Sequence, residues 1–322
     1  MASTALGRKV RLTPPGPAST PGPMSSPSAS NPPIGPEIIS GLSAVADRYD
    51  AVLCDVWGVI HNGQVGFPAA HEALTRFQQS RGPVVLISNS PRPSGAVLPQ
   101  LRALGVPDDA WSTLITSGDV TRSELAARAP GPAWVIGPDR DLVLYDDLHL
   151  DFAGPEDAAF VSCTGLVDDE TETPEDYRAR LAVAAGRGLE LICANPDRVV
   201  QRGAMMIPCA GALADLYETL GGRVVMAGKP YPPIYVRARD ELDRLAGRPI
   251  DAARVLTIGD GLPTDVLGAR RMGLDCLFVT DGIHATETQG PDRQPERGRL
   301  DAFLAAHETF ARYAVADLVW GG

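Results

Sequence analysis

Five polar residues in this sequence have types and positions that suit chemistry on an anion: Asp55, Ser88, Lys229, Asp260 and Asp265. The first four follow short apolar runs, directly or after one glycine, and Asp265 comes five residues after Asp260. Carboxylates beside a lysine and a hydroxyl form a site for a small hard cation and an anion, because Mg²⁺ binds carboxylate oxygens and shares phosphate oxygens with its substrate. In such a site Asp55 could attack phosphorus and become an aspartyl-phosphate. Lys229 and Ser88 would hold the phosphoryl oxygens.

The elements that must position these residues are short strands and amphipathic helices, which alternate from residue 38 onward. The apolar runs that predict strands are 51–54, 84–87, 113–115, 133–136, 159–162, 189–193, 223–227, 254–258 and 274–279. The helix-like stretches are 68–80, 93–104, 118–129, 174–187, 208–220, 231–246 and 262–272. This alternation predicts an α/β fold with a mainly parallel sheet. Ligands of such sheets bind beyond the carboxyl ends of the strands. The candidate residues therefore converge if the runs that precede them form neighbouring strands.

Composition limits the classes of partner. The chain has 29 Lys plus Arg and 40 Asp plus Glu, a net charge of −11. This charge argues against binding to nucleic acid or to an anionic membrane, because both need clustered cations. No apolar stretch approaches the roughly 20 residues that span a bilayer. The five scattered cysteines form no CxxC pair, which indicates buried free thiols and a cytoplasmic location. We expect the Pro- and Ser-rich residues 1–37 to form a disordered tail.

Four segments, in order, resemble the four motifs of the haloacid dehalogenase (HAD) superfamily: DVWGV, LISNSPRP, GKPYPPIY and IGDGLPTD. The segments ICANPDRVV and IPCAGAL resemble class IIA, the subgroup of NagD-type and p-nitrophenyl phosphatase-like enzymes. The resemblance implies a Rossmann-like three-layer core with a parallel sheet, at 38–129 and 226–322, and a large α/β cap inserted at 130–225. It also implies a Mg²⁺-dependent hydrolase that acts on a small phosphorylated metabolite. A homodimer through the cap is a further expectation.

The resemblance assigns the metal site to four residues. Asp55 is the nucleophile and a metal ligand, and the backbone carbonyl of Trp57 is the second protein ligand. Asp260 is the third ligand, and Asp265 supports the metal and the lysine.

The resemblance also assigns the substrate-binding residues. Ser88 and Asn89 bind the phosphoryl group, and Lys229 neutralises its charge. Asn195 and Asp197 lie in the cap close to the crevice. Since cap residues set substrate choice in this superfamily, the leaving group would be recognised from about residues 130–225.

Trp57 is the main departure from the family pattern. Phosphatases of the superfamily usually have a second Asp at this position, which protonates the leaving oxygen and then activates water. A tryptophan side chain does neither, and such acid–base help typically contributes about 10²–10⁴-fold. The alternative function is therefore a catalytically weakened protein that binds a phosphate ligand or acts in regulation. Transfer of the phosphoryl group to an acceptor other than water is a third option.

Several residues have a second interpretation. His61 could replace the missing acid because histidine titrates near neutral pH, but stabilisation of the turn at HNG is the favoured role. Arg92 could contact the substrate or lie exposed in its loop. Asn195 and Asp197 flank a proline in a segment that is also typical of a plain turn. Asp265 would equally suit the first turn of a helix, where the helix dipole favours negative charge.

Overall fold

The computed structural model describes residues 35–202 and 205–321. The predicted disordered tail at 1–37 lies almost wholly outside the described residues. Its last residue was assigned wrongly, because Glu37 pairs with Tyr313 in strand β1 (Glu37–Ile38). Among the described helices, none is long and apolar enough to cross a membrane.

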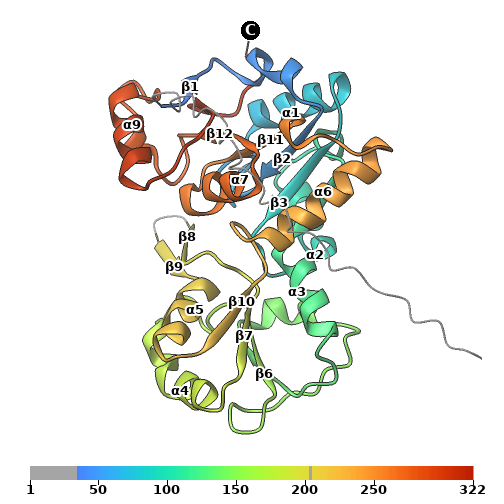
Figure 1. Cartoon of the computed structure of the whole chain (residues 1–322), viewed down its shortest axis with the longest axis vertical. Helices are drawn as coiled ribbons and strands as arrows, with labels where there is room; N and C mark the ends of the chain where they lie inside the picture. Colours follow the sequence, from blue (N-terminus) through green and yellow to red (C-terminus); the bar gives the residue numbers. More distant parts are fainter. Residues whose placement is uncertain (1–34, 203–204, 322) are drawn as a thin grey trace, which may run out of the picture. The chain divides into compact units, whose positions relative to one another are not determined.

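A seven-stranded parallel sheet forms the core (Figure 1). In spatial order its strands are β1, β13 (Tyr313–Val315), β12 (Asp275–Val279), β11 (Val255–Gly259), β2 (Ala51–Asp55), β3 (Val84–Ser88) and β4 (Thr113–Thr116). The central strands are apolar on both faces, as expected for a parallel sheet covered on both sides. All five residues of β2, for example, are buried.

Helices cover both faces of this sheet, since buried apolar side chains form one cluster on each side of it. The first cluster includes side chains of α1 (Pro68–Ser80) and α2 (Ser94–Ala103). The second includes side chains of α6 (Pro232–Ala246), α7 (Leu267–Met272) and α9 (Arg297–Ala306). The expected Rossmann-like, three-layer α/β core is therefore confirmed.

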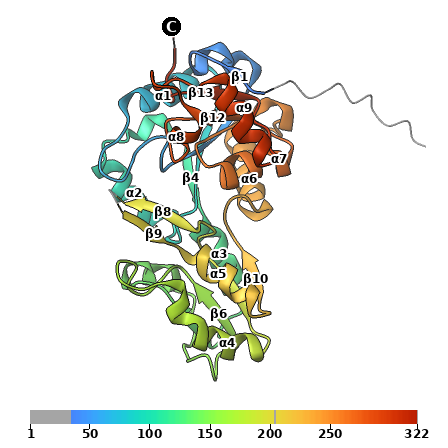
Figure 2. The same ribbon diagram turned by 90° about the vertical axis from the view of Figure 1, so that its left-hand side faces the viewer.

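A second parallel sheet lies in the chain segment between α3 (Ser117–Ala126) and α6 (Figure 2). In spatial order its strands are β10 (Arg223–Met226), β7 (Glu190–Cys193), β6 (Phe160–Cys163) and β5 (Ala133–Ile136). Helices α4 (Arg178–Gly186) and α5 (Ala210–Thr219) pack on it. An antiparallel hairpin, β8 (Val199–Arg202) and β9 (Met205–Pro208), precedes α5. We call the segment from β5 to β10 the cap; the sequence predicts a cap at 130–225.

One expectation about the sheet was wrong. The apolar run before Lys229 does not neighbour the strands that precede Asp55, Ser88 and Asp260. Instead it forms β10, which pairs with β7 at the edge of the cap sheet. An apolar run with a polar end predicts a strand and its exit point, but the choice of sheet depends on long-range packing. Lys229 reaches the core from the connection between β10 and α6.

Candidate functional site

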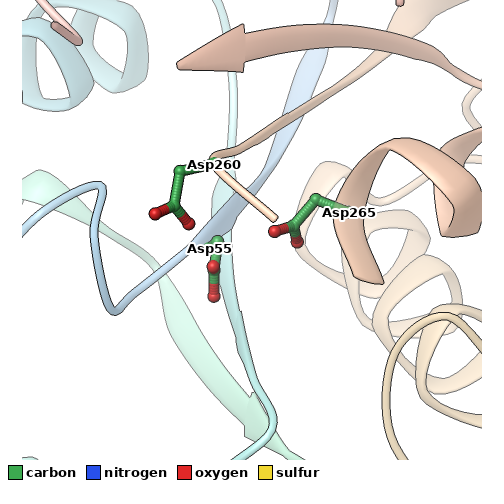
Figure 3. Close-up of side chains that lie close together, drawn as sticks. All are labelled: Asp55, Asp260 and Asp265. Atoms are coloured by element: carbon green, nitrogen blue, oxygen red, sulfur yellow. The ribbon is translucent and has the colours of Figure 1, made fainter. Parts of the chain in front are cut away.

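Three buried carboxylates meet beyond the carboxyl ends of β2 and β11 (Figure 3). Asp55 ends β2, Asp260 follows β11, and Asp265 lies in a π-helical turn, η7 (Leu262–Val266). Because β2 and β11 are neighbouring parallel strands, their ends lie side by side. One oxygen from each carboxylate lies within 4.8 Å of the others. The predicted convergence of these three residues is therefore present in the fold.

Lys229 lies inside this cluster. Its Nζ is 2.5 Å from Asp55 Oδ1 and 2.8 Å from Asp265 Oδ1, and the side chain is only 2% exposed. One ammonium against three carboxylates leaves two unbalanced negative charges when all are ionised. Buried charge without compensation is strongly unfavourable. A divalent cation with oxygen ligands, such as Mg²⁺, fits both the charge and the donor type.

The pKa values of Asp55, Asp260 and Lys229 shift in the directions that burial and this charge imbalance predict. Burial, followed by repulsion from Asp265, raises the pKa of Asp55 well above its usual value. The same two causes raise the pKa of Asp260 to about 7. Burial alone would lower the pKa of Lys229, but the carboxylates of Asp265 and Asp55 outweigh it and raise that pKa. Lys229 is therefore a permanent cation, while Asp55 and Asp260 depend on a positive partner to ionise together.

The two oxygens of Asp55 have different surroundings. Oδ1 accepts hydrogen bonds from its neighbour Val56 N, at 2.7 Å, and from Lys229. Among the described residues, none donates a hydrogen bond to Oδ2. Asp55 also lines the pocket described below. One oxygen is thus held by the protein and the other is available to a ligand.

Asp265 lies in the first turn of η7 and accepts a hydrogen bond from Lys229. Its Oδ2 accepts a hydrogen bond from Gly261 N at 3.0 Å, which caps its own turn, while Oδ1 accepts one from Lys229.

Asp260 is held by the backbone around it, since its Oδ2 accepts a hydrogen bond from Ile283 N at 3.1 Å. Gly58, with φ of 83°, lies directly over Asp260, and a Cβ there would be 2.1 Å from Oδ2. The turn after β2 therefore needs glycine in order to pass this close to the carboxylates.

The indole of Trp57 packs on its own turn. A Cβ on Gly63 would be 2.1 Å from Trp57 Cη2. The indole also packs edge-to-face against the His61 ring, with 5.4 Å between the ring centroids. His61 is buried, and its Nδ1 accepts from Gly63 N at 3.0 Å. Burial, with a smaller effect of His71, lowers the pKa of His61 to about 4. His61 is thus neutral at pH 7 and stabilises the turn, as the favoured interpretation predicts.

Asn89 is held by protein groups on both sides of its amide. Its Nδ2 donates to Asp197 Oδ1 at 2.8 Å and to Lys229 O at 3.1 Å, and its Oδ1 accepts from Lys229 N at 2.7 Å. Asn89 therefore fixes the backbone of Lys229. Ser88 ends β3, where its Oγ accepts from Ser90 N at 3.2 Å.

Asn195 and Asp197 form the predicted turn and also reach the site. Asn195 Oδ1 accepts from Asp197 N at 3.0 Å. Burial raises the pKa of Asp197, and the hydrogen bond from Asn89 opposes this shift. Both residues line the same pocket as Asp55.

A pocket of about 270 Å³ joins these residues. All nine residues predicted for the site except Asp265 line it, as do His61 and Arg92, whose Nη2 donates to Gln100 Oε1 at 2.8 Å. The lining also contains charged or hydroxyl side chains of the cap that were not predicted: Arg140, Asp141, Thr164 and Asp169. They follow the carboxyl ends of β5 and β6, so the strand-end signal used for the core could have found some of them.

Comparison with known proteins gives consistent matches. Residues 52–151 match the family model described as haloacid dehalogenase-like hydrolase, and residues 226–304 match a second one, described as HAD-hydrolase-like. A solved haloacid dehalogenase-like hydrolase from Brucella suis 1330 is 42% identical, with a TM-score of 0.78, over 88% of this chain and 100% of that one.

Two curated relatives are more distant. Chronophin from Bos taurus is 27% identical over 325 residues, which cover 88% of this chain and 96% of chronophin. The ribonucleotide monophosphatase NagD from Escherichia coli K12 is 26% identical over 238 residues, which cover 73% of this chain and 89% of NagD.

Proposed function

The chain belongs to the haloacid dehalogenase-like hydrolase family, and we propose that it is a phosphatase of small phosphate esters. The observation that carries the proposal is the buried cluster of Asp55, Asp260, Asp265 and Lys229 at one pocket. The relative NagD is named a monophosphatase, which agrees with this reaction type.

We also propose a cytoplasmic location. All five cysteines are buried and unpaired, as is usual for proteins of a reducing compartment.

In the proposed mechanism Asp55 is the nucleophile. Its free carboxylate oxygen attacks phosphorus, the ester P–O bond breaks, and the leaving oxygen keeps the electron pair and takes a proton from solvent. Water then attacks phosphorus and loses a proton to solvent. The P–O bond to Asp55 breaks, which releases inorganic phosphate and restores the carboxylate. Lys229 stays charged throughout and offsets the charge of the phosphoryl oxygens. Asn89 keeps Lys229 in place through its backbone.

Mg²⁺ is the proposed cofactor, because the candidate ligand atoms are carboxylate oxygens and the cluster has excess negative charge. Mg²⁺ is a hard cation that prefers oxygen ligands. Asp55, Asp260 and the carbonyl of Trp57 would hold it, and Asp265 would support it. When bound, Mg²⁺ would supply positive charge next to the transferred phosphoryl group.

The missing acid–base group shapes the proposed activity. Trp57 packs on Gly63 and has no carboxylate. His61 is neutral at pH 7 and therefore does not act as a general acid. Esters with good leaving groups need little protonation, so we expect them to react faster than alkyl esters. Trp57 is also the observation that favours the second candidate, a catalytically weakened phosphate-binding or regulatory protein. Ligand binding without any turnover would support that candidate.

The test is hydrolysis of p-nitrophenyl phosphate and a panel of phosphorylated metabolites, with and without Mg²⁺. We expect Mg²⁺-dependent phosphate release that falls by more than about 10³-fold in Asp55→Asn. Asp109→Asn, a change at an exposed residue outside the pocket, is the matched control and should behave as wild type. Activity that survives in Asp55→Asn would rule out this mechanism.

A further inference from the structure

The cap side of the pocket contains a buried carboxylate that the proposed reaction does not use. Asp141 lies in the 3-10 helix η4 (Asp139–Tyr145), is 4% exposed, and lines the pocket. It is on the cap, away from the strand ends that carry the three carboxylates of the cluster. Asp141 is therefore placed to meet the leaving group and not the phosphoryl group.

Asp141 has no salt-bridge partner within the described part of the chain. Arg140, the adjacent arginine, instead forms an ion pair with Asp169. The Thr164 hydroxyl is a polar neighbour of Asp141, but this buried oxygen makes no hydrogen bond of normal geometry to a described residue. Burial raises the pKa of Asp141. The charge of Arg140, the Thr164 hydroxyl and the more weakly acting charge of Arg92 offset only part of the shift.

This arrangement is complementary to a cation. A buried carboxylate without a salt bridge is unfavourable, and a ligand cation next to it would offset its charge. A second phosphate or carboxylate on the substrate would meet repulsion at Asp141. A hydroxyl would supply a hydrogen bond but no charge.

We propose that Asp141 binds an ammonium group of the leaving group, so that the preferred substrates are phosphate monoesters of amino alcohols. The inference rests on the proposed phosphatase function and names the substrate class of the same pocket. The Thr164 hydroxyl, which has no hydrogen-bond acceptor, lies where it can add a polar contact to the leaving group. Hydrolysis would follow the steps given above, and the ammonium takes no part in bond breaking.

The test compares matched substrates: 2-aminoethyl, 3-aminopropyl and 4-aminobutyl phosphate against the corresponding ω-hydroxyalkyl phosphates. We expect wild-type kcat/KM to favour at least one amino member over its hydroxyl partner by tenfold or more. In Asp141→Asn this preference should fall at least tenfold, mainly through KM. Asp139→Asn, an exposed change on the same short helix and outside the pocket, should leave the preference intact.

Two further measurements separate the possible failures. Asp141→Glu keeps the charge and should keep part of the preference, and it replaces Asp141→Asn if that variant does not fold. Calorimetric binding of the aminoalkyl phosphates to wild type and Asp141→Asn tests the inference even without turnover. No hydrolysis of any ester contradicts the phosphatase proposal alone. Equal kcat/KM and equal binding for the amino and hydroxyl esters overturn the role of Asp141.

Discussion

Asn89 of the core and Asp197 of the cap are joined by a hydrogen bond of 2.8 Å between Nδ2 and Oδ1. The same Asn89 amide makes two hydrogen bonds to the backbone of Lys229. One side chain therefore connects the cap to the loop that carries the central cation of the site. The position of the cap and the position of Lys229 are linked through this amide.

Removal of that amide should loosen both connections. In Asn89→Ala the buried Lys229 N–H and the half-buried Asp197 carboxylate lose their partner. An unsatisfied buried N–H costs about 1–3 kcal/mol, and the half-buried carboxylate costs less. We expect a lower free energy of unfolding and a lower kcat. A double-mutant cycle with Asp197→Ala, measured by denaturant unfolding, should give a coupling energy of about 0.5–3 kcal/mol. Strictly additive effects would show that the two residues act separately.

Lys229 should affect catalysis and metal binding in opposite directions. Lys229→Met removes the one cation among three carboxylates, so the site becomes more negative. We expect Mg²⁺ to bind at least as tightly as in wild type, measured by calorimetry, while kcat falls by about 10²–10³-fold. Asp260→Asn is the matched control and should weaken Mg²⁺ binding. Loss of Mg²⁺ affinity in Lys229→Met would contradict the view that excess negative charge drives Mg²⁺ binding at this site.

His61 should make the free energy of unfolding fall as the pH is lowered. Its pKa is about 4 in the fold against an ordinary value of 6.5, so the folded protein favours the neutral ring. This contribution is complete above about pH 6.5 and is lost as the pH falls toward 4. His61→Asn, which keeps an acceptor for Gly63 N, should flatten the decline by up to about 1.4 kcal/mol per pH unit in that window. Unfolding free energies measured from pH 7.5 to 4.5 test this, and parallel curves would exclude it.

Trp57 should limit the hydrolysis of esters with poor leaving groups. Trp57→Asp restores a carboxylate two residues after Asp55, and we expect kcat for an alkyl phosphate to rise by about 10²-fold or more. The rise for p-nitrophenyl phosphate should be smaller, because its leaving group needs no proton. Trp57→Asn controls for the change in size. Equal rates in the Asp and Asn variants would mean that the new carboxylate transfers no proton.

Local sequence patterns predicted most elements of the fold correctly. The apolar run before Asp55 forms β2, and the stretch at 68–80 forms α1 with the same bounds. Such elements depend on side-chain periodicity and on Gly or Pro at their ends, which are properties of neighbouring residues. The helix expected at 208–220 was misplaced at its start, because Pro208 ends β9 and α5 begins at Ala210.

Features that depend on distant parts of the chain could not be predicted in this way. The short strands β1 and β13 exist through pairing between residues far apart in sequence, such as Glu37 with Tyr313. The sheet to which β10 belongs depends on its packing against β7. The sequence placed Asp55, Lys229 and Asp260 together, but it did not reveal the Asn89–Asp197 hydrogen bond or the position of Asp141.

Trapping the covalent intermediate tests directly whether Asp55 is the nucleophile. The protein is mixed with p-nitrophenyl phosphate and Mg²⁺, quenched in acid, digested and analysed by peptide mass spectrometry. Since Trp57 does not activate water, the intermediate should break down slowly and accumulate. We predict one phosphoryl group on the peptide that contains Asp55 and none in Asp55→Asn. Phosphate release without any phosphorylated Asp55 peptide, or phosphorylation at another residue, would contradict the account.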